Sequence, residues 1–313
     1  LAPPGVGIDH DVVVTMRGAS SGDSGKAKLS YLGPVVNSAS YVPTAGGTVT
    51  ISGENFGPVP DNSTGVYNGV AGPQVTITSS TGTDLPCTNI TVATAHKDIT
   101  CNIAKGTGGN YSIVVDVGSQ SSGETGKNKL SYHPPQPLTI FPLEQKQTDL
   151  DSGNTMITVT GKNFGDDYTK LKVKVGDVFA EQTSIRMFFV QDGLVEVIAR
   201  VPAGAGSEVP VRVVVDGVQS VLNSNITFSY LAPYVTSATP VGTAGGLIEI
   251  FGGNFGPNGT VPHTVTLGGV ACASPMTTEN STIQCTAAPG VGKDLDVFIQ
   301  IGANSNMNSN PSG

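Results

Sequence analysis

Hydrophobic and polar residues alternate in a run that occurs three times along the chain, each time before the same short motif. The first run is Thr48-Val49-Thr50-Ile51-Ser52, within the stretch TAGGTVTISGENFGP from Thr44 to Pro58. The stretch returns as TAGGLIEIFGGNFGP from Thr243 to Pro257, and a weaker copy, SGNTMITVTGKNFGD, runs from Ser152 to Asp166. Alternation with a period of two is typical of a half-buried strand. The pattern therefore predicts three equivalent β-strands.

The motif that follows each strand is Gly-x-Asn-Phe-Gly. Its glycines permit positive φ, so the chain can leave the strand sharply. Asn beside Gly suits a turn because its side chain hydrogen-bonds nearby backbone, and the Phe can fold back to plug the end of a small core. We interpret the motif as a structural corner and not as a binding site. Its residues are Gly53, Asn55, Phe56 and Gly57, then Gly161, Asn163, Phe164 and Gly165, then Gly252, Asn254, Phe255 and Gly256.

A second motif ends each unit. It reads KLSY at Lys28–Tyr31 and Lys129–Tyr132, and TFSY at Thr227–Tyr230, so successive tyrosines are about 100 residues apart. Solenoid repeats run to about 20–50 residues. The longer period indicates an array of whole domains.

On these two motifs the chain resembles tandem IPT/TIG domains. These are immunoglobulin-like modules found in plexins and related receptors, in some transcription factors and in slime-mould surface proteins used for self-recognition. The resemblance covers nearly the whole chain, and the motif is specific for the module but not for one function. It implies an all-β fold of tandem immunoglobulin-like (E-set/IPT-TIG) β-sandwiches and a role in recognition or adhesion.

The repeats divide the chain into four parts. Short links that hold Pro join them (SYLGPVV, SYHPPQP and SYLAPYV), and Pro stiffens a joint, so we expect an extended rod. The first part would supply a strand at Val12–Met16 and a last strand at Ala27–Tyr31. The expected parts are 1–32, the last two strands of a partial domain; 33–133 and 134–231, two whole domains; and 232–313, a domain lacking its final strand.

Within the first whole unit, alternation and turn residues place the strands. Cys87 falls on a Pro-containing loop by this interpretation, and Cys101 falls on a strand. The expected strands are Val35–Ser40, Thr48–Ser52, Gln74–Thr78, Ile99–Ile103, Tyr111–Val117 and Lys129–Tyr132.

The segment Arg186–Val190, with Met187, Phe188 and Phe189, is the most apolar stretch outside the repeated motifs. It could belong to the core of the second unit or form an exposed contact patch. Large apolar patches are uncommon on monomers, so we expect it in the core.

Composition fits several thin sandwiches rather than one large core. Of 313 residues, 38% are hydrophobic, with 41 Gly, 21 Pro and no Trp. The net charge of −8 and the absence of a Lys/Arg cluster argue against nucleic acid, which needs a basic footprint. No apolar run approaches the ~20 residues of a membrane span. No signal peptide is visible either, so we expect a segment of a longer secreted or surface protein.

Cysteines and glycosylation sequons favour an oxidising, extracellular location. Four cysteines form two close pairs, Cys87 with Cys101 and Cys272 with Cys285, without metal-type spacing. We interpret them as two intradomain disulfides; the alternative is four buried free thiols. N-linked glycans are expected at the six Asn-x-Ser/Thr sequons. The sequon residues are Asn62, Asn89, Asn110, Asn225, Asn258 and Asn280.

The second unit lacks cysteine, and apolar packing is expected to replace the bridge. Aligning Pro202 with Pro289 places Ile198 opposite Cys285, and aligning the Gly-Val turns places Phe179 near the position of Cys272.

No arrangement of residues indicates catalysis. There is no Gly-x-Ser-x-Gly, His-Glu-x-x-His or P-loop sequence, and the four histidines are scattered. Asp166-Asp167 and the pair Asp149 and Asp151 could attract calcium, but Ca²⁺ takes six to eight oxygens. We therefore expect solvated turns there, no metal or other cofactor beyond glycans, and no enzyme activity.

The sequence leaves three functional hypotheses. The first is adhesion or recognition at a cell surface, with another extracellular protein or copies of itself as the partner. The alternative is a structural subunit of an extracellular filament that assembles head-to-tail, by strand complementation between incomplete terminal domains. A third, a carbohydrate-binding appendage, has little support because sugar platforms need exposed aromatics and the chain has no Trp.

Overall fold

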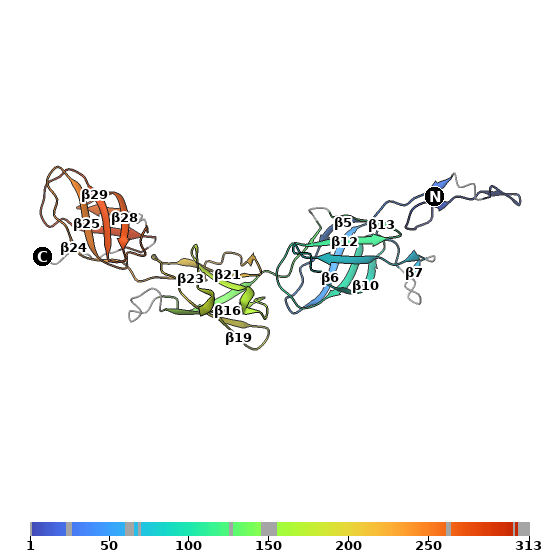
Figure 1. Ribbon diagram of the computed structural model, residues 1–313, viewed down its shortest axis with the longest axis horizontal. Coiled ribbons are helices and arrows are strands. Elements are labelled where there is room, and N and C mark those ends of the chain that lie inside the picture. The colour runs from blue at the N-terminus through green and yellow to red at the C-terminus, as the bar shows by residue number, and fades with distance from the viewer. Residues whose placement is uncertain are drawn as a thin grey trace. The chain divides into compact units, whose positions relative to one another are not determined.

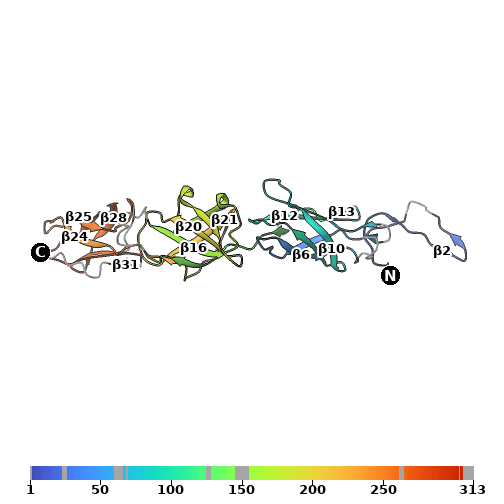
Figure 2. The same cartoon turned by 90° about the horizontal axis from the view of Figure 1, so that it is seen from below.

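The structure is a computed structural model that describes residues 2–22, 27–59, 66–67, 70–124, 128–144, 155–260, 264–302 and 304–305. Its regular elements are β-strands in separate sheets, with two short 3-10 helices (Figures 1 and 2). Contacts divide the chain into two compact units, 1–134 with 215–218, and 135–214 with 219–313. The alternating sequence pattern produces three β-sandwiches, which are described one by one.

The first sandwich has two antiparallel sheets around an aliphatic core that includes Val49, Ile51, Ile99 and Ile113. The first sheet has the order β10-β11-β6-β5, with β5 Val35–Ala39, β6 Gly47–Glu54, β10 Cys87–Thr94 and β11 Asp98–Ile103. In the second sheet β12 (Tyr111–Val117) pairs with β9 (Gln74–Thr78), β13 (Gln120–Ser121) and β14 (Lys129–Leu130). A two-residue hairpin, β7 Val66–Tyr67 with β8 Val70–Ala71, stands apart from both.

The second sandwich repeats this plan. One sheet has the order β15-β16-β20-β19, with β15 Gln136–Phe141, β16 Met156–Lys162, β19 Arg186–Phe189 and β20 Val195–Arg200. The other is built around β21 (Val209–Val215), with β17 Leu171–Val175, β18 Val178–Phe179, β22 Val218–Gln219 and β23 Thr227–Phe228. The 3-10 helices η1 (Tyr168–Lys170) and η2 (Gln182–Ser184) lie in its connections.

The third sandwich has sheets β24-β25-β29-β28 and β27-β26-β30-β31. Cys272 and Cys285 belong to its buried core. The strands are β24 Tyr234–Ala238, β25 Gly246–Gly253, β26 Thr264–Leu267, β27 Val270–Ala271, β28 Ala273–Glu279, β29 Thr282–Ala287, β30 Val297–Ile301 and β31 Asn304–Ser305.

Residues 2–22 and 27–32 form short pairings. The strand expected at Val12–Met16 is broken, because β1 (His10–Asp11) pairs with β4 (Lys28–Leu29) while β2 (Thr15–Met16) turns back onto β3 (Ala19–Ser20). The expected last strand is therefore only two residues long here. An apolar run without an apposed sheet does not extend as one strand.

In the first sandwich all six expected strands occur, with β14 shorter than expected. The prediction that Cys87 lies on a loop is wrong. Cys87 begins β10, an eight-residue strand along the edge of its sheet. The sequence analysis placed Cys87 on a loop because Pro86 precedes it. A strand nevertheless tolerates Pro at or next to its first residue.

The repeated motif forms the corner that its residues predict. Phe56, Phe164 and Phe255 are all 0% exposed, and each aromatic ring reaches back to its own first glycine. A Cβ on Gly53 would collide with the carbonyl oxygen of Val35 and with the Phe56 ring. Any larger residue there would separate β5 from β6.

The asparagines of the motif form a turn and also make a hydrogen bond to a residue far away in the sequence. Asn55 and Asn254 have φ of 61° and 62°, in the left-handed region where Asn is tolerated. Asn55 Nδ2 donates to the carbonyl oxygen of Gly33, and Asn254 Nδ2 donates to that of Ala232, both at 2.9 Å. Each asparagine therefore fixes the residue that leads into its own sandwich.

Candidate functional site

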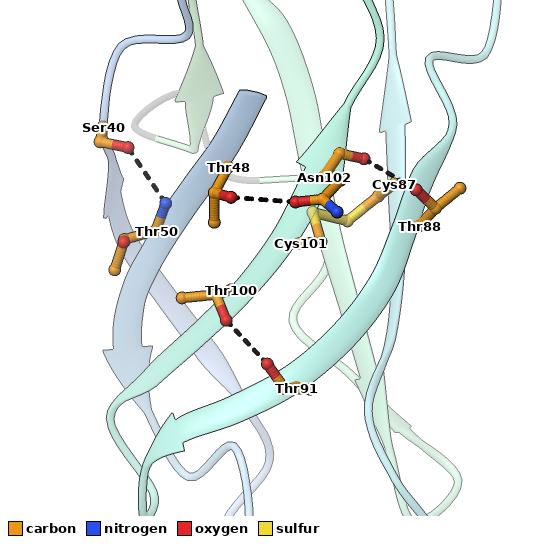
Figure 3. Close-up of a disulfide and its surroundings, with 9 residues drawn as sticks. All are labelled: Ser40, Thr48, Thr50, Cys87, Thr88, Thr91, Thr100, Cys101 and Asn102. Atoms are coloured by element: carbon orange, nitrogen blue, oxygen red, sulfur yellow. Dashed lines mark hydrogen bonds between the residues drawn. A yellow bond between two sulfur atoms is a disulfide. The ribbon is translucent and has the colours of Figure 1, made fainter. Parts of the chain in front are cut away.

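Two disulfides link neighbouring strands at one position in the first and third sandwiches. Cys87 bonds Cys101 with a Cα–Cα distance of 5.6 Å, and Cys272 bonds Cys285 at 5.7 Å. Figure 3 shows the first bridge beside the threonines of its sheet. The described residues contain no free cysteine. These bridges require an oxidising environment to form and persist.

The register of the second sandwich shows what replaces the bridge. Cys101 pairs with Val49 and Cys285 with Ile248, and at the equivalent place Ala199 pairs with Ile157. The alignment that put Ile198 opposite Cys285 is thus wrong by one residue. The counterpart of Cys272 is Ala180, because the Ala180 amide donates to the Val173 carbonyl at 2.8 Å as the Cys272 amide donates to the Val265 carbonyl at 2.9 Å. Phe179, expected near this position, is the residue directly before it. Two buried alanines, Ala180 and Ala199, thus occupy the positions of the two cysteines.

Outward positions of the sheet that contains β6 are polar in the first sandwich. The Thr48 Oγ1 donates to Asn102 Oδ1 at 2.9 Å, and the hydroxyls of Thr91 and Thr100 lie 2.8 Å apart (Figure 3). Ser40 Oγ accepts a hydrogen bond from the Thr50 amide at 3.0 Å. We call this surface the threonine face, defined by Ser40, Thr48, Thr50, Thr91, Thr94, Thr100 and Asn102.

The threonine face also holds a carboxylate. Ser52 Oγ donates to Asp98 Oδ1 at 2.7 Å, and this hydrogen bond, with a second from Thr94, lowers the pKa of Asp98. Hydroxyl donors stabilise the ionised form. The face is thus hydrophilic and internally hydrogen-bonded.

The corresponding surface of the second sandwich is apolar. Phe141 is 70% exposed, Phe188 50% and Met156 40%. Cross-strand pairing puts Phe141, Thr158 and Ile198 in one row, and Phe188 opposite Glu196 in the next. We call this surface the apolar face, defined by Phe141, Met156, Phe188 and Ile198.

The apolar face corrects one sequence prediction. The segment Arg186–Val190 does not belong to the core, because Phe188, Phe189 and Val190 are 50%, 66% and 43% exposed. β19 lies at the edge of its sheet, and alternation turns Met187 toward the interior while Phe188 faces out. The structure thus agrees with the alternative in that the segment is exposed.

The strand register shows which outward residues of the three sandwiches occupy the same position in the fold. Counting from the motif glycine and along the ladders, Ser40 corresponds to Phe141, and Thr100 to Ile198. In the third sandwich the same positions are mixed. The four equivalent outward sets are Ser40, Phe141 and Thr239; Thr48, Met156 and Leu247; Thr94, Phe188 and Glu279; and Thr100, Ile198 and Gln284.

Charged side chains lie among and beside the residues of the apolar face. Arg186 pairs with Ile198 across the ladder, and Arg200 pairs with Met156. Glu196 lies between Thr160 and Phe188 in its row. An apolar centre with a charged rim is the usual anatomy of a protein interface.

The sequon residues are accessible where the structure describes them. Asn89, Asn110, Asn225, Asn258 and Asn280 are exposed, and Asn62 lies outside the described residues. Asn89 lies on β10 and Asn280 in the turn before β29. Their glycosylation stays a prediction.

The acidic pairs have structural roles where they are described. Asp167 caps η1, since its Oδ1 accepts hydrogen bonds from the Thr169 hydroxyl at 2.6 Å and the Thr169 amide at 2.9 Å, which lower the pKa of Asp167. Asp149 and Asp151 lie outside the described residues. Within the described ranges, no group of three or more His, Cys, Asp or Glu side chains could hold a metal ion. No described helix is long and apolar enough to cross a membrane.

The fold defines a protein of tandem immunoglobulin-like β-sandwiches. A family model for the IPT/TIG domain matches residues 34–132, 139–230 and 233–312. The chain therefore belongs to the IPT/TIG domain family, as its motifs predict. The exact boundaries of the predicted units, with the partial domain at 1–32, stay predictions, as does the extended rod.

Solved structures with similar folds share little sequence with this chain. The full extracellular region of plexin A4 is 14% identical, with 87% of this chain and 28% of that chain covered and a TM-score of 0.30. The Escherichia coli adhesin FdeC is 12% identical, with 88% and 94% covered and a TM-score of 0.23. The I9–I11 tandem of titin is 12% identical, with 88% and 95% covered and a TM-score of 0.21. At these values the likenesses carry no conclusion about function. No curated protein matches the chain.

Proposed function

We propose that this chain is a non-enzymatic extracellular recognition or adhesion segment that binds its partner through the apolar face of the second sandwich. The partner is another extracellular protein or a copy of this chain. The observation that carries the proposal is the replacement of four hydrophilic outward positions by Phe141, Met156, Phe188 and Ile198 at the same places in one fold.

The energetics of such a face favour a protein partner. Phe side chains bury on the order of 150–250 Å² each and are frequent anchors of interfaces. Leaving Phe141 70% exposed and Phe188 50% exposed forgoes this stabilisation in the free chain. A partner that covers both rings would recover it.

The disulfides and sequons support the extracellular part of the proposal. Cys87–Cys101 and Cys272–Cys285 suit an oxidising compartment. In the first sandwich, the sequon at Asn89 lies on the strand that carries Thr91 and Thr94, so a glycan there would shield the threonine face. The apolar face has no sequon among its strands.

The test exchanges the face for the residues of the first sandwich. A chain with Phe141→Ser and Phe188→Thr would be coated on fluorescent beads beside the unchanged chain, and bead-to-bead and bead-to-cell adhesion would be counted. We expect adhesion to fall at least tenfold. The matched control is Leu247→Thr, which removes a 68% exposed side chain from the equivalent sheet of the third sandwich and should leave adhesion unchanged. Equal adhesion by all three proteins would contradict the proposal.

A second candidate is a structural subunit of an extracellular filament. One observation favours it: Leu29 in the Lys28–Tyr31 segment is 37% exposed, whereas its counterparts Leu130 and Phe228 are 0% exposed. A strand with an exposed core residue could complete a sandwich of a neighbour. Electron microscopy of the purified protein tests this candidate, since long uniform filaments that disappear when residues 1–32 are deleted would support it, and separate particles at all concentrations would contradict it.

A further inference from the structure

The outer strands of three equivalent sheets differ in how regularly they pair. The sheets are β10-β11-β6-β5, β15-β16-β20-β19 and β24-β25-β29-β28, and the outer strands are the first and last of each order (Figure 1). Within the described residues, the ladders of β5, β10, β15, β24 and β28 each contain a register shift. β19 pairs with β20 without a shift from Arg186 to Phe189.

The two counterparts of β19 carry a bulge at the same place. One extra residue lies within Val92–Thr94 of β10 and within Thr277–Glu279 of β28. At the corresponding step of β19, Met187 and Phe188 are consecutive and pair with consecutive residues of β20. Bulges bend and twist an outer strand, and natural sheets use them to prevent further pairing at their edges. β19 lacks this protection.

Other devices that protect an edge are also absent from β19. β28 contains Pro275, which has no amide to donate to a further strand, and β10 contains the sequon residue Asn89. β19 contains neither Pro nor a sequon, and its one charged residue is Arg186, at its first position. A charge in the middle of an outer strand would also discourage pairing.

The backbone groups on the open side of β19 follow from its register. The Val190 amide donates to the Leu194 carbonyl at 2.9 Å, where the hairpin of β19 and β20 closes. Bonded and non-bonded pairs alternate along an antiparallel ladder. Counted back from this bonded pair, Met187 and Phe189 direct their amides and carbonyls away from β20. The described residues place no strand on that side of β19.

The side chains of this edge are apolar on both faces of the sheet. Phe188 is 50% exposed and Phe189, which points to the opposite face, is 66% exposed. Val190, directly after the strand, is 43% exposed. A regular, exposed and apolar outer strand is a template for the addition of another strand.

We propose that β19 pairs antiparallel with β19 of a second copy of this chain, around a two-fold axis at Phe188. In this register Met187 of each copy pairs with Phe189 of the other, and each donates to and accepts from its partner. All the backbone groups that Met187 and Phe189 leave open are thereby satisfied. Phe188 lies opposite Phe188 of the copy in a non-bonded pair, where side chains are closest.

The sequence of the strand is complementary to itself in this register. Arg186 lies opposite Val190 of the copy, so like charges do not meet across the ladder. The next charged residue along the copy is Asp192, of opposite sign. A two-fold contact of this kind uses the same surface on both copies and closes with two of them. The pairing uses the edge of β19 and shares only Phe188 with the apolar face, so it goes beyond the proposed function.

The contact is small. A ladder of four residues falls short of the ~1,200 Å² that standard protein interfaces bury. We therefore expect a weak and reversible dimer that forms where the chains are concentrated.

Sedimentation velocity of the whole chain, from about 1 to about 500 µM, tests the pairing. We expect a dimer whose proportion rises with concentration. Phe189→Lys places a charge on the edge and should weaken the dimer at least tenfold while leaving thermal unfolding unchanged. The matched control is Phe141→Lys on β15, the opposite outer strand, which is 70% exposed and should leave the dimer intact. A chain that stays monomeric, or dimers that Phe189→Lys leaves unchanged, would overturn the proposal.

Cysteine cross-linking tests the register. In a non-bonded antiparallel pair the Cα atoms are about 4.5 Å apart, which a disulfide can span. Phe188→Cys should therefore form disulfide-linked dimers under mild oxidation. Arg186→Cys is the control and should cross-link at least tenfold less, because residue 186 lies opposite Val190 of the copy. Equal cross-linking of the two variants would overturn the pairing around Phe188.

The bead assay separates this proposal from the proposed function, because Phe189 does not belong to the apolar face. A monomeric chain whose adhesion is lost on exchange of Phe141 and Phe188 would overturn the pairing and leave the proposed function standing. Dimers that Phe189→Lys weakens, with adhesion unaffected by that exchange, would support the pairing and contradict the proposed function. A monomeric chain that loses adhesion to cells with Phe189→Lys would overturn the second copy in favour of a strand from another protein.

Discussion

The first and second sandwiches share a fold and differ at almost every outward position of one sheet. Inside, Val49 and Ile51 correspond to Ile157 and Val159, all of them 0% exposed. Outside, Ser40, Thr94 and Thr100 of the first sandwich are replaced by Phe141, Phe188 and Ile198 in the second. The fold constrains the inward residues through packing, whereas the outward residues are free to serve contacts. The proposed function of the second sandwich rests on this difference in its outward residues.

The two sandwiches also differ in how the edge of that sheet is held. Cys87 and Cys101 join β10 to β11 in the first, whereas in the second the buried Ala180 and Ala199 occupy the positions that the cysteines of the third sandwich define. A covalent link and apolar packing are thus alternative solutions at one place. The following predictions test which features the two sandwiches share and which belong to one alone.

The largest effect is expected at the shared corner. Phe56→Ala and Phe164→Ala should each cost about 3–5 kcal/mol, because each removes a fully buried ring and leaves a cavity. Calorimetric unfolding of the two variants checks this, with Phe141→Ala as the exposed control. A much smaller loss for Phe164→Ala than for Phe56→Ala would show that the corners are not equivalent.

Removal of the disulfides should lower the stability of some sandwiches and not of others. Cys87→Ala with Cys101→Ala is expected to lower the stability of the first sandwich by about 2–5 kcal/mol, mainly because the unfolded chain is no longer constrained. Reduction of the unchanged chain should destabilise the first and third sandwiches and leave the second unaffected. Limited proteolysis followed by mass spectrometry identifies which sandwich opens, and equal opening of all three would contradict the assignment.

Neighbouring residues of β20 should respond in opposite ways. Val197→Thr places a hydroxyl in the core, where Val197 is 0% exposed, and should cost about 1–3 kcal/mol. Ile198→Thr, on the apolar face, should cost about 1 kcal/mol or less. Urea unfolding of both variants provides the comparison. A larger cost for Ile198→Thr would mean that the face is needed for the fold itself.

The smallest predicted effect is a pH dependence that both sandwiches share. The pKa of Tyr132 is raised to about 12 by burial, against about 10 in an unfolded chain. Below pH 10 the phenol is protonated in both states and its stabilisation is complete. Between pH 10 and 12 the unfolded state loses protons first, so stability falls as pH rises. Urea unfolding at pH 9 and pH 11.5 checks this, and Tyr132→Phe should show a weaker dependence on pH.

Much of the fold could be predicted because short sequence patterns that recur along the chain correspond directly to its strands and turns. The alternation at Thr48–Ser52 and the Gly-x-Asn-Phe-Gly motif identified the central strand and corner of each sandwich, and cysteine spacing identified both bridges. The predictions failed where the start or the register of a strand depends on the strand that pairs with it. Pro86 hid the start of β10, and a one-residue error in register moved the counterpart of Cys285 from Ala199 to Ile198.

The candidate site was harder to predict than the fold for the same reason. Apolar composition alone could not distinguish core from surface at Arg186–Val190. The period of two shows that Met187 and Phe188 face opposite ways, but not which of the two faces another sheet covers.

The sequence by itself determined the family, the tandem repeat, the inward residues and the cysteine pairs, because these depend on short-range periodicity and spacing. Tertiary structure decided that β19 is an edge strand with Phe188 outward, and that Asn55 reaches back to Gly33. These features depend on residues far apart in the chain, which only strand pairing and sheet packing bring together.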